Sequence, residues 1–359
     1  MIKYLGSKRA LVGVLGALAE GSGAGTAVDL FTGTTRVAQE FKRRGLHVTA
    51  ADLASYSEVL AGCYIATDAT SVDDAELDGL LAELNALPGH RGYVTETFCE
   101  QSRFFQPHNG QRIDAIRERL VALSGHPLYP VLLTALMEAA DRVDSTTGQH
   151  MAYLKSWAPR ASNELRLRRP QLLAGHGRAV RGDALLVVQQ LPPTDVMYLD
   201  PPYNQHRYFT NYHIWETLVR WDAPQHYGVA CKRTDARTDA HTSAFNSRRT
   251  MPDALAEVIG LARAELLLVS YNDESWISPD QIVGWLRDAG HRRVELLAFD
   301  SRRYVGARIG IYNHVGEKVG RVSHTRNTEY VFVAGCADRV EAALARQAAD
   351  TAATAHQPA

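Results

Sequence analysis

Residues 27–35 read AVDLFTGTT, a short apolar run that ends in a glycine turn. Beyond the turn, apolar side chains recur at helical spacing at Val37, Ala38 and Phe41. Residues 47–52, HVTAAD, form a second apolar run that ends in an acid. This order of strand, turn, helix and strand predicts a βαβ unit of a parallel sheet, and therefore an α/β fold.

Strand-like runs return late in the chain, at residues 196–199, 265–270, 294–299 and 329–333. The region from about Asp68 to Arg178 has a helical periodicity instead, with loop signals at residues 88–90 and 107–110. We therefore expect a sheet that is interrupted by a mostly helical insertion.

The bulk composition limits the classes of protein that this chain can represent. With 359 residues and 45% hydrophobic content, it can bury a large core, which predicts a catalytic domain plus a smaller module. It contains no run of eighteen apolar residues, so we expect a soluble, cytoplasmic protein without a membrane segment. The four cysteines form no C-x-x-C pair, which favours free thiols and implies no metal.

The run at residues 196–199 ends in Asp200, Pro201, Pro202 and Tyr203. Two consecutive prolines donate no ladder hydrogen bonds, so the chain must leave the sheet at this point. Open parallel sheets bind their ligands at this carboxyl edge. The motif is thus the first candidate for a catalytic loop, the alternative being a plain strand-ending turn.

This motif suits an exocyclic amine, whose nitrogen lone pair is delocalised and poorly nucleophilic. If the Asp200 carboxylate and the Pro201 carbonyl each accept one N–H, the nitrogen is held with its lone pair directed toward an incoming methyl group. Tyr203 would offer a face on which an unstacked base rests. Catalysis of this kind relies mainly on positioning and electrostatics.

Two further acids are candidates for binding a cofactor. Residues 30–35, LFTGTT, are not the G-x-G-x-x-G that a pyrophosphate needs, so a cofactor without phosphates is favoured. Asp52 ends the second strand about twenty residues later, where a carboxylate commonly binds ribose hydroxyls. Asp183 precedes the next strand and is a candidate for an adenine amino group. The alternatives are a capping and a turn aspartate.

Basic residues cluster at residues 155–181 and 301–327, although the net charge is −1. A local basic face is what a polyanion needs, whereas the alternative is ordinary solvated helix faces. The polar and aromatic excursion at residues 206–250 carries further arginines. The candidate DNA-binding residues in the cluster at residues 155–181 and in this excursion are Arg166, Arg168, Arg169, Arg207, Arg233 and Arg248.

Together these segments resemble the Dam-like alpha-class DNA adenine methyltransferases. Residues 3–8, KYLGSK, look like the first motif of that family, in which an aromatic and a lysine contact the cofactor and the target region. Asp52 and Asp183 match its ribose and adenine acids, and Asp200–Tyr203 its catalytic loop. Thr35 stands where the family often has glycine. The residues that this resemblance adds to the cofactor site are Tyr4, Lys8, Asp29, Phe31, Gly33, Thr34 and Asp200.

The resemblance implies a Rossmann-like seven-strand sheet that binds S-adenosylmethionine. The catalytic domain would comprise residues 1–67 and 179–336, a helical target-recognition domain residues 68–178, and a tail residues 337–359. The implied activity is N6-methylation of an adenine that is flipped out of double-stranded DNA at a specific site. A cognate restriction endonuclease is left open. The alternatives are methylation of guanine N2 in RNA and a catalytically silent DNA-binding module.

Overall fold

The computed structural model describes residues 2–4, 8–202, 208–238, 243–302, 311–312, 318–320 and 326–355. It divides into two compact units. The first unit consists of Met1–Tyr4, Thr32–Asp183 and His206–Ser243. The second unit consists of Leu5–Phe31, Ala184–Gln205 and Ala244–Ala359.

The second unit contains five strands of the sheet, in the order β1-β4-β7-β11-β8. β1 pairs with β4 and β4 with β7 in parallel, whereas β11 lies antiparallel between β7 and β8. β4 and β7 are almost completely buried, as the near-continuous apolar sequence of central parallel strands requires. The bounds are β1 (Thr26–Asp29), β4 (Thr194–Leu199), β7 (Ala264–Asn272), β8 (Arg293–Arg302) and β11 (Arg326–Gly335).

The second unit also contains two short strands and several helices. The strands β9 (Ile311–Tyr312) and β10 (Lys318–Gly320) pair with each other. The helices are α1 (Val12–Gly21), α8 (Ala184–Gln190), η7 (Ala244–Asn246), α11 (Met251–Leu261), α12 (Pro279–Asp288) and α14 (Ala337–Ala355).

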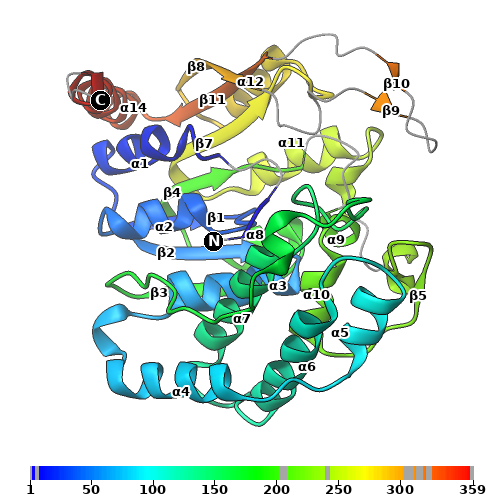
Figure 1. The fold of residues 1–359 in the computed structure, drawn as a ribbon. Helices are drawn as coiled ribbons and strands as arrows, with labels where there is room; N and C mark the ends of the chain where they lie inside the picture. Colours follow the sequence, from blue (N-terminus) through cyan, green and yellow to red (C-terminus); the bar gives the residue numbers. More distant parts are fainter. Residues whose placement is uncertain are drawn as a thin grey trace. The chain divides into compact units, whose positions relative to one another are not determined.

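Residues 337–355 of the carboxyl-terminal tail form the helix α14. α14 lies beside α1 (Figure 1). Arg346 of α14 pairs with Glu20 of α1 at 3.2 Å, and Arg339 donates to the carbonyl of Ser22. The alanine-rich sequence is explained by this close packing, since small side chains let the two helices approach.

The first unit contains the parallel pair β2 (His47–Asp52) and β3 (Gly177–Arg181), with Asp52 opposite Arg181. β2 was predicted, whereas β3 was not. β3 reads GRAVR and exposes or half-exposes every residue, so it lacks the apolar run that marks a buried strand. A small antiparallel hairpin, β5 (His226–Tyr227) and β6 (Lys232–Arg233), belongs to the same unit.

Helices make up most of the first unit, and α6 and α7 pack side by side (Figure 1). The expected helical character of residues 68–178 is present in part: helices recur between residues 69 and 143, whereas residues 144–158 and 163–176 are not helical and a strand begins at Gly177. The helices and helical turns are α2 (Arg36–Arg43), α3 (Ser55–Ala61), η1 (Gly62–Ala66), η2 (Ala69–Ser71), α4 (Asp74–Ala86), α5 (Tyr93–Thr95), η3 (Glu96–Glu100), α6 (Pro107–Val121), α7 (Tyr129–Val143), η4 (Pro159–Ser162), α9 (Tyr208–Asn211), α10 (His213–Arg220) and η5 (Thr234–Arg237).

The α/β fold with a seven-strand, mostly parallel sheet is confirmed. The division of the chain differs from the domains we expected from the sequence. The first unit includes residues 32–67 and 206–243 as well as the helical insertion. The reason is that α3 and α10 pack against each other and α3 against α7, which joins sequence segments that composition alone assigns to different domains.

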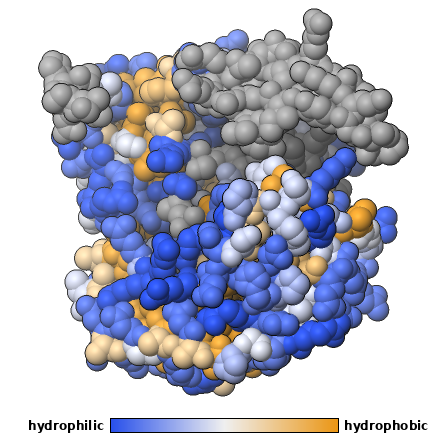
Figure 2. Space-filling model, viewed as in Figure 1, coloured by the Kyte–Doolittle hydropathy of each residue, from blue (hydrophilic) through white to orange (hydrophobic). Residues whose placement is uncertain are grey.

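The surface is mainly polar on the face shown in Figure 2, where hydrophilic residues cover most of the described part. Large exposed apolar side chains, such as Leu186 and Val229, are scattered among the described residues. Within the same residues, no helix is both long enough and apolar enough to cross a membrane.

Candidate active site

Asp200 directly follows β4, at the carboxyl edge of the parallel strands in the second unit. Pro201 and Pro202 then lead the chain away from the sheet, as predicted. On the neighbouring strand β1, Asp29 lies opposite Tyr198 in the register, so Asp29 and Asp200 end adjacent strands. Two carboxylates are therefore brought to one edge by strand pairing alone.

Lys8 links Asp200 to a third carboxylate that the sequence did not identify. Its Nζ lies 3.1 Å from Asp200 Oδ1 and 3.1 Å from Glu329 Oε2 on β11. The lysine side chain is only 6% exposed, whereas those of Asp200 and Glu329 are 17% and 16% exposed. The ammonium is thus enclosed, and each carboxylate keeps a side that a substrate can reach.

The protonation of Asp200 is set by this environment. The pKa of Asp200 is raised to about 6, because burial and the Glu329 carboxylate, which raise it, outweigh the Lys8 ammonium, which lowers it. At neutral pH Asp200 is therefore mainly ionised and can accept hydrogen bonds. Two residues before Asp200, the buried Tyr198 hydroxyl donates to Ser270 Oγ at 2.8 Å and so links the end of β4 to β7.

The first unit contains the glycine turn and the predicted ribose acid. Asp52 Oδ2 accepts the backbone N–H of Gly33 at 2.8 Å, and Oδ1 accepts that of Ala54 at 3.0 Å. Burial raises the pKa of the Asp52 carboxyl, and these amide hydrogen bonds oppose the shift. The orientation of the Asp52 carboxylate at the end of β2 is thus fixed by backbone amides and not by other side chains.

Gly33 and Thr35 determine the shape of this turn. Both have a positive φ, of 50° for Gly33 and 63° for Thr35. A Cβ at Gly33 would lie 3.1 Å from the ring of Tyr4, so glycine permits the close approach of that ring. Thr35 adopts the left-handed conformation that favours glycine, and its hydroxyl is bonded to the Thr34 carbonyl at 2.7 Å. The departure from the family pattern therefore preserves the turn.

Tyr4 belongs to an aromatic cluster in the first unit. Its ring stacks on Tyr212 at 4.6 Å and on Tyr208 at 5.3 Å between ring centroids. Its hydroxyl lies 3.2 Å from that of Tyr56. The stack gives the glycine turn an aromatic wall, and sequence reasoning had identified Tyr4 alone.

Asp183, the predicted adenine-side acid, follows the strand that pairs with the strand of Asp52, the predicted ribose acid. Asp183 follows β3, and the N–H of Gly182 donates to the Asp52 carbonyl at 3.0 Å. The two acids therefore end neighbouring parallel strands of the first unit.

In the second unit, Phe31 contacts Phe245 edge to face, with 5.0 Å between ring centroids.

Three predicted DNA-binding arginines are exposed on the first unit. Residues 163–173 form neither helix nor strand, and the side chains of residues 165–168 alternate: Leu165 and Leu167 are buried, whereas Arg166 and Arg168 are exposed. The N–H groups of both leucines donate to asparagine side chains, at 2.8 and 2.9 Å, which holds the segment in place. Arg169 is exposed and pairs with Asp74.

Arg233 requires a correction, because its guanidinium is buried and bound to carboxylates. It donates to Asp222 at 2.7 and 2.6 Å and to Asp235 at 3.0 and 2.7 Å, and the side chain is 1% exposed. No phosphate can reach it, so we remove it from the DNA-binding set. Arg248 is exposed on the second unit. Tyr203 and Arg207 lie outside the described residues.

Comparisons with known proteins define the class of this chain. Residues 4–284 match the model of the D12 class N6 adenine-specific DNA methyltransferases. The match spans most of the chain and includes both aspartates that end β2 and β4. The chain belongs to this family of adenine-specific DNA methyltransferases.

Curated relatives are type II methyltransferases. M.NlaIII of Neisseria lactamica is 29% identical, over 80% of this chain and 86% of that protein. M.FokI of Planomicrobium okeanokoites is 28% identical over 73% of this chain, which spans only 43% of the length of M.FokI. M.CviAII of Paramecium bursaria Chlorella virus 1 is 25% identical, over 80% of this chain and 87% of that protein. These matches support site-specific adenine methylation of DNA.

Proposed function

We propose that this chain transfers a methyl group from S-adenosylmethionine to N6 of an adenine that is rotated out of double-stranded DNA. The observation that carries the proposal is Asp200 at the carboxyl end of β4, with its carboxylate held by the enclosed ammonium of Lys8. An acceptor fixed at a strand end fits the positioning of a weakly nucleophilic amine.

The residues of the first unit fit the proposed cofactor. Asp52 is a carboxylate presented by backbone amides, which suits two ribose hydroxyls. The turn at Gly33 lacks the glycine pattern for a pyrophosphate and borders the Tyr4 ring. We assign ribose binding to Asp52, the adenine amino group to Asp183, and apolar contact to Tyr4. Asp29, Phe31, Gly33, Thr34 and Lys8 complete the proposed set.

S-adenosylmethionine supplies an electrophilic methyl group when it is bound. Asp200 accepts one N–H of the target amine, and the Pro201 carbonyl accepts the other. Both acceptors gain strength as positive charge develops on the nitrogen during transfer, so they stabilise the transition state more than the ground state. The excess proton then leaves through the Asp200 carboxylate. Tyr203 takes over part of the stacking of the extruded base.

Arg166, Arg168 and Arg169 are proposed to bind DNA phosphates, with Arg207 and Arg248 as further contacts. We also propose a cytoplasmic location, which suits an enzyme that acts on DNA and whose four cysteines are free. The type II relatives favour a companion restriction endonuclease with the same recognition sequence.

A transfer assay tests the proposed function. The full chain is incubated with tritiated S-adenosylmethionine and either duplex DNA or ribosomal RNA, and the labelled nucleoside is identified by chromatography. We expect N6-methyladenine from DNA. Labelled N2-methylguanine from RNA, with no label in DNA, would transfer the chain to the alternative function.

A further inference from the structure

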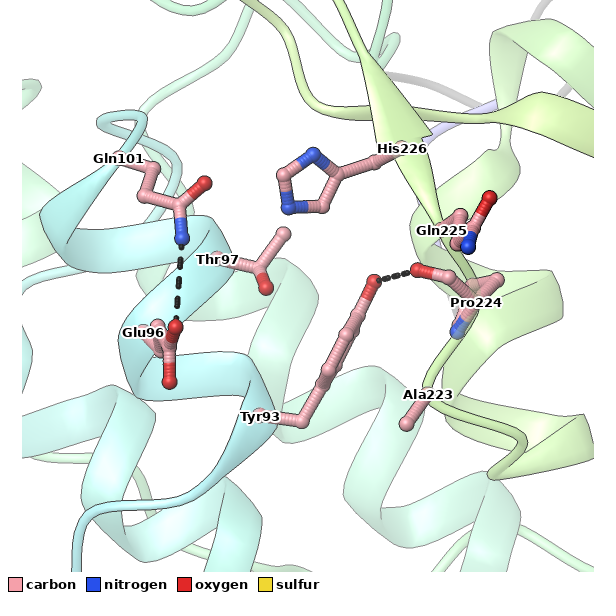
Figure 3. A pocket seen from close by; sticks show the side chains of 8 residues that line it. All are labelled: Tyr93, Glu96, Thr97, Gln101, Ala223, Pro224, Gln225 and His226. Atoms are coloured by element: carbon pink, nitrogen blue, oxygen red, sulfur yellow. Dashed lines mark hydrogen bonds between the residues drawn. The ribbon is translucent and has the colours of Figure 1, made fainter.

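A pocket of about 410 Å³ lies in the first unit and is lined by residues to which the proposed function gives no role (Figure 3). One wall is Tyr93 and the helical turn η3, and the other is the segment 223–226 that enters β5. The volume is within the range of about 300–1,000 Å³ that is typical of ligand sites.

The first wall is held in place by hydrogen bonds to a buried aspartate of α6. Asp114 of α6 accepts the backbone N–H groups of Gly92, Val94 and Thr95 at 2.8–3.0 Å. η3 is a π-helical turn, a rare conformation that is frequently found at functional sites. Tyr93 then ties the two walls together, because its hydroxyl donates to the Pro224 carbonyl at 2.7 Å (Figure 3).

The second wall is held by the buried Arg233. Its guanidinium binds both Asp222, at the start of this wall, and Asp235 beyond the hairpin. Trp221 and Ala223 have positive φ angles of 50° and 41°, which are unfavourable for residues other than glycine. A strained conformation persists where its surroundings over-determine it, so this surface segment is rigidly positioned.

The side chains that line the pocket carry donor and acceptor groups of the kind that read base edges. Gln101 and Gln225 each offer donors and an acceptor, and Glu96 offers acceptors. Glutamine pairs with adenine N6 and N7, and glutamate accepts from the amino group of cytosine. Glu96 and Gln101 are joined by one long bond of 3.5 Å, so a ligand can displace it readily. His226 and Tyr93 project between the walls (Figure 3).

The acid that lines the pocket is ion-paired, which suits a neutral base better than a charged ligand. The Glu96 side chain is 51% exposed and lies 3.5 Å from the Arg91 guanidinium, so its negative charge is partly balanced. A second cation, Arg237 of η5, stacks its guanidinium over the ring of Tyr227 at 4.4 Å, and Tyr227 directly follows His226 in the chain. Hydrogen-bonding side chains therefore line the pocket, and the cations Arg91 and Arg237 contact Glu96 of its lining and Tyr227, the neighbour of His226.

We infer that this pocket binds the edge of one DNA base of the recognition sequence other than the target adenine, and thereby contributes to sequence specificity. The inference rests on the proposed function. Gln101 and Gln225 supply the hydrogen bonds, and Tyr93 and Arg233 position the two walls that carry them.

The test compares the double variant Gln101→Ala/Gln225→Ala with the control Gln189→Ala/Gln190→Ala, which removes two exposed glutamines of α8. Methylated adenines are mapped in the DNA of cells that express each protein. kcat/KM is then measured on the site of the wild type and on duplexes with single base substitutions. We expect the pocket variant to lose roughly 5- to 150-fold of its discrimination at one position, and the control to retain all of it.

Two results would overturn the inference while leaving the methylation activity intact: unchanged discrimination at every position, or an equal loss on all duplexes. If the wild type makes no N6-methyladenine in DNA, the proposed function itself fails. Tyr93→Phe removes the bond to Pro224 and retains the ring. It should weaken discrimination at the same position, and a change at a different position would contradict the inference. Thermal melting verifies that each variant is folded.

Discussion

Asp52 and Asp200 are similar carboxylates in different settings. Each ends a parallel strand, and burial raises the pKa of each. The oxygens of Asp52 are held by the backbone amides of Gly33 and Ala54. Asp200 is held by the side chain of Lys8, which it shares with Glu329.

The difference separates binding from chemistry. Backbone amides neither titrate nor change rotamer, so Asp52 is an acceptor of fixed position and suits a ligand that has to be held. A lysine shared between two carboxylates can redistribute its hydrogen bonds as charge develops at the reacting nitrogen. We therefore expect changes at Asp52 to affect affinity and changes at Asp200 to affect turnover.

The largest effect is expected for Asp200→Ala, which removes the acceptor that orients the target amine. Turnover should fall by several orders of magnitude, because the missing interaction strengthens in the transition state. A gel-shift titration should show DNA binding largely retained, since affinity rests mainly on phosphate contacts. Near-wild-type methyl transfer by this variant would refute the mechanism.

Asp52→Ala should weaken the binding of S-adenosylmethionine by roughly 10- to 150-fold, the equivalent of about 1.5–3 kcal/mol for hydrogen bonds to a charged group. Asp195→Ala is a matched control, because Asp195 also accepts two backbone amides, at 2.8 Å each, but lies near the opposite end of β4. Calorimetry should detect weaker binding in the first variant alone. Equal affinities in both folded variants would remove Asp52 from the site.

Replacing Arg166, Arg168 and Arg169 with glutamine tests whether DNA is bound by residues other than Asp52 and Asp200. The affinity for DNA should fall, and the slope of log affinity against log salt should decrease by about 0.9 for each phosphate that an arginine no longer neutralises. The exposed Arg287 and Arg292 of the second unit serve as the control pair. An unchanged slope would mean that the three arginines face solvent.

The smallest effect is expected in the pH profile. The methyl transfer rate should fall as the pH drops below about 6, because protonation of Asp200 removes the acceptor. Glu329→Gln removes a negative charge that raises this pKa, so the acid limb should move to lower pH. Lys8→Met should move it to higher pH. Identical acid limbs in all three proteins would show that Asp200 does not control the profile.

The positions of most strands follow from the sequence. β1, β2, β4, β7 and β11 were each predicted from an apolar run, because strands that are buried in a sheet must be apolar. β8 was also predicted from its apolar residues 294–299, although these residues are half-exposed or exposed. The two prolines after Asp200 also determine where β4 ends, since they cannot continue a ladder. β3 escaped prediction because GRAVR is half exposed and carries two arginines.

The roles of charged side chains depended on the tertiary structure. Arg166 and Arg233 are chemically identical, and only packing makes one exposed and the other buried between two aspartates. Glu329 lies 321 residues from Lys8, so no local pattern could reveal their contact. Local sequence specifies apolar periodicity and backbone stops, whereas burial and charge pairing arise from contacts between distant segments, which form only when the chain has folded.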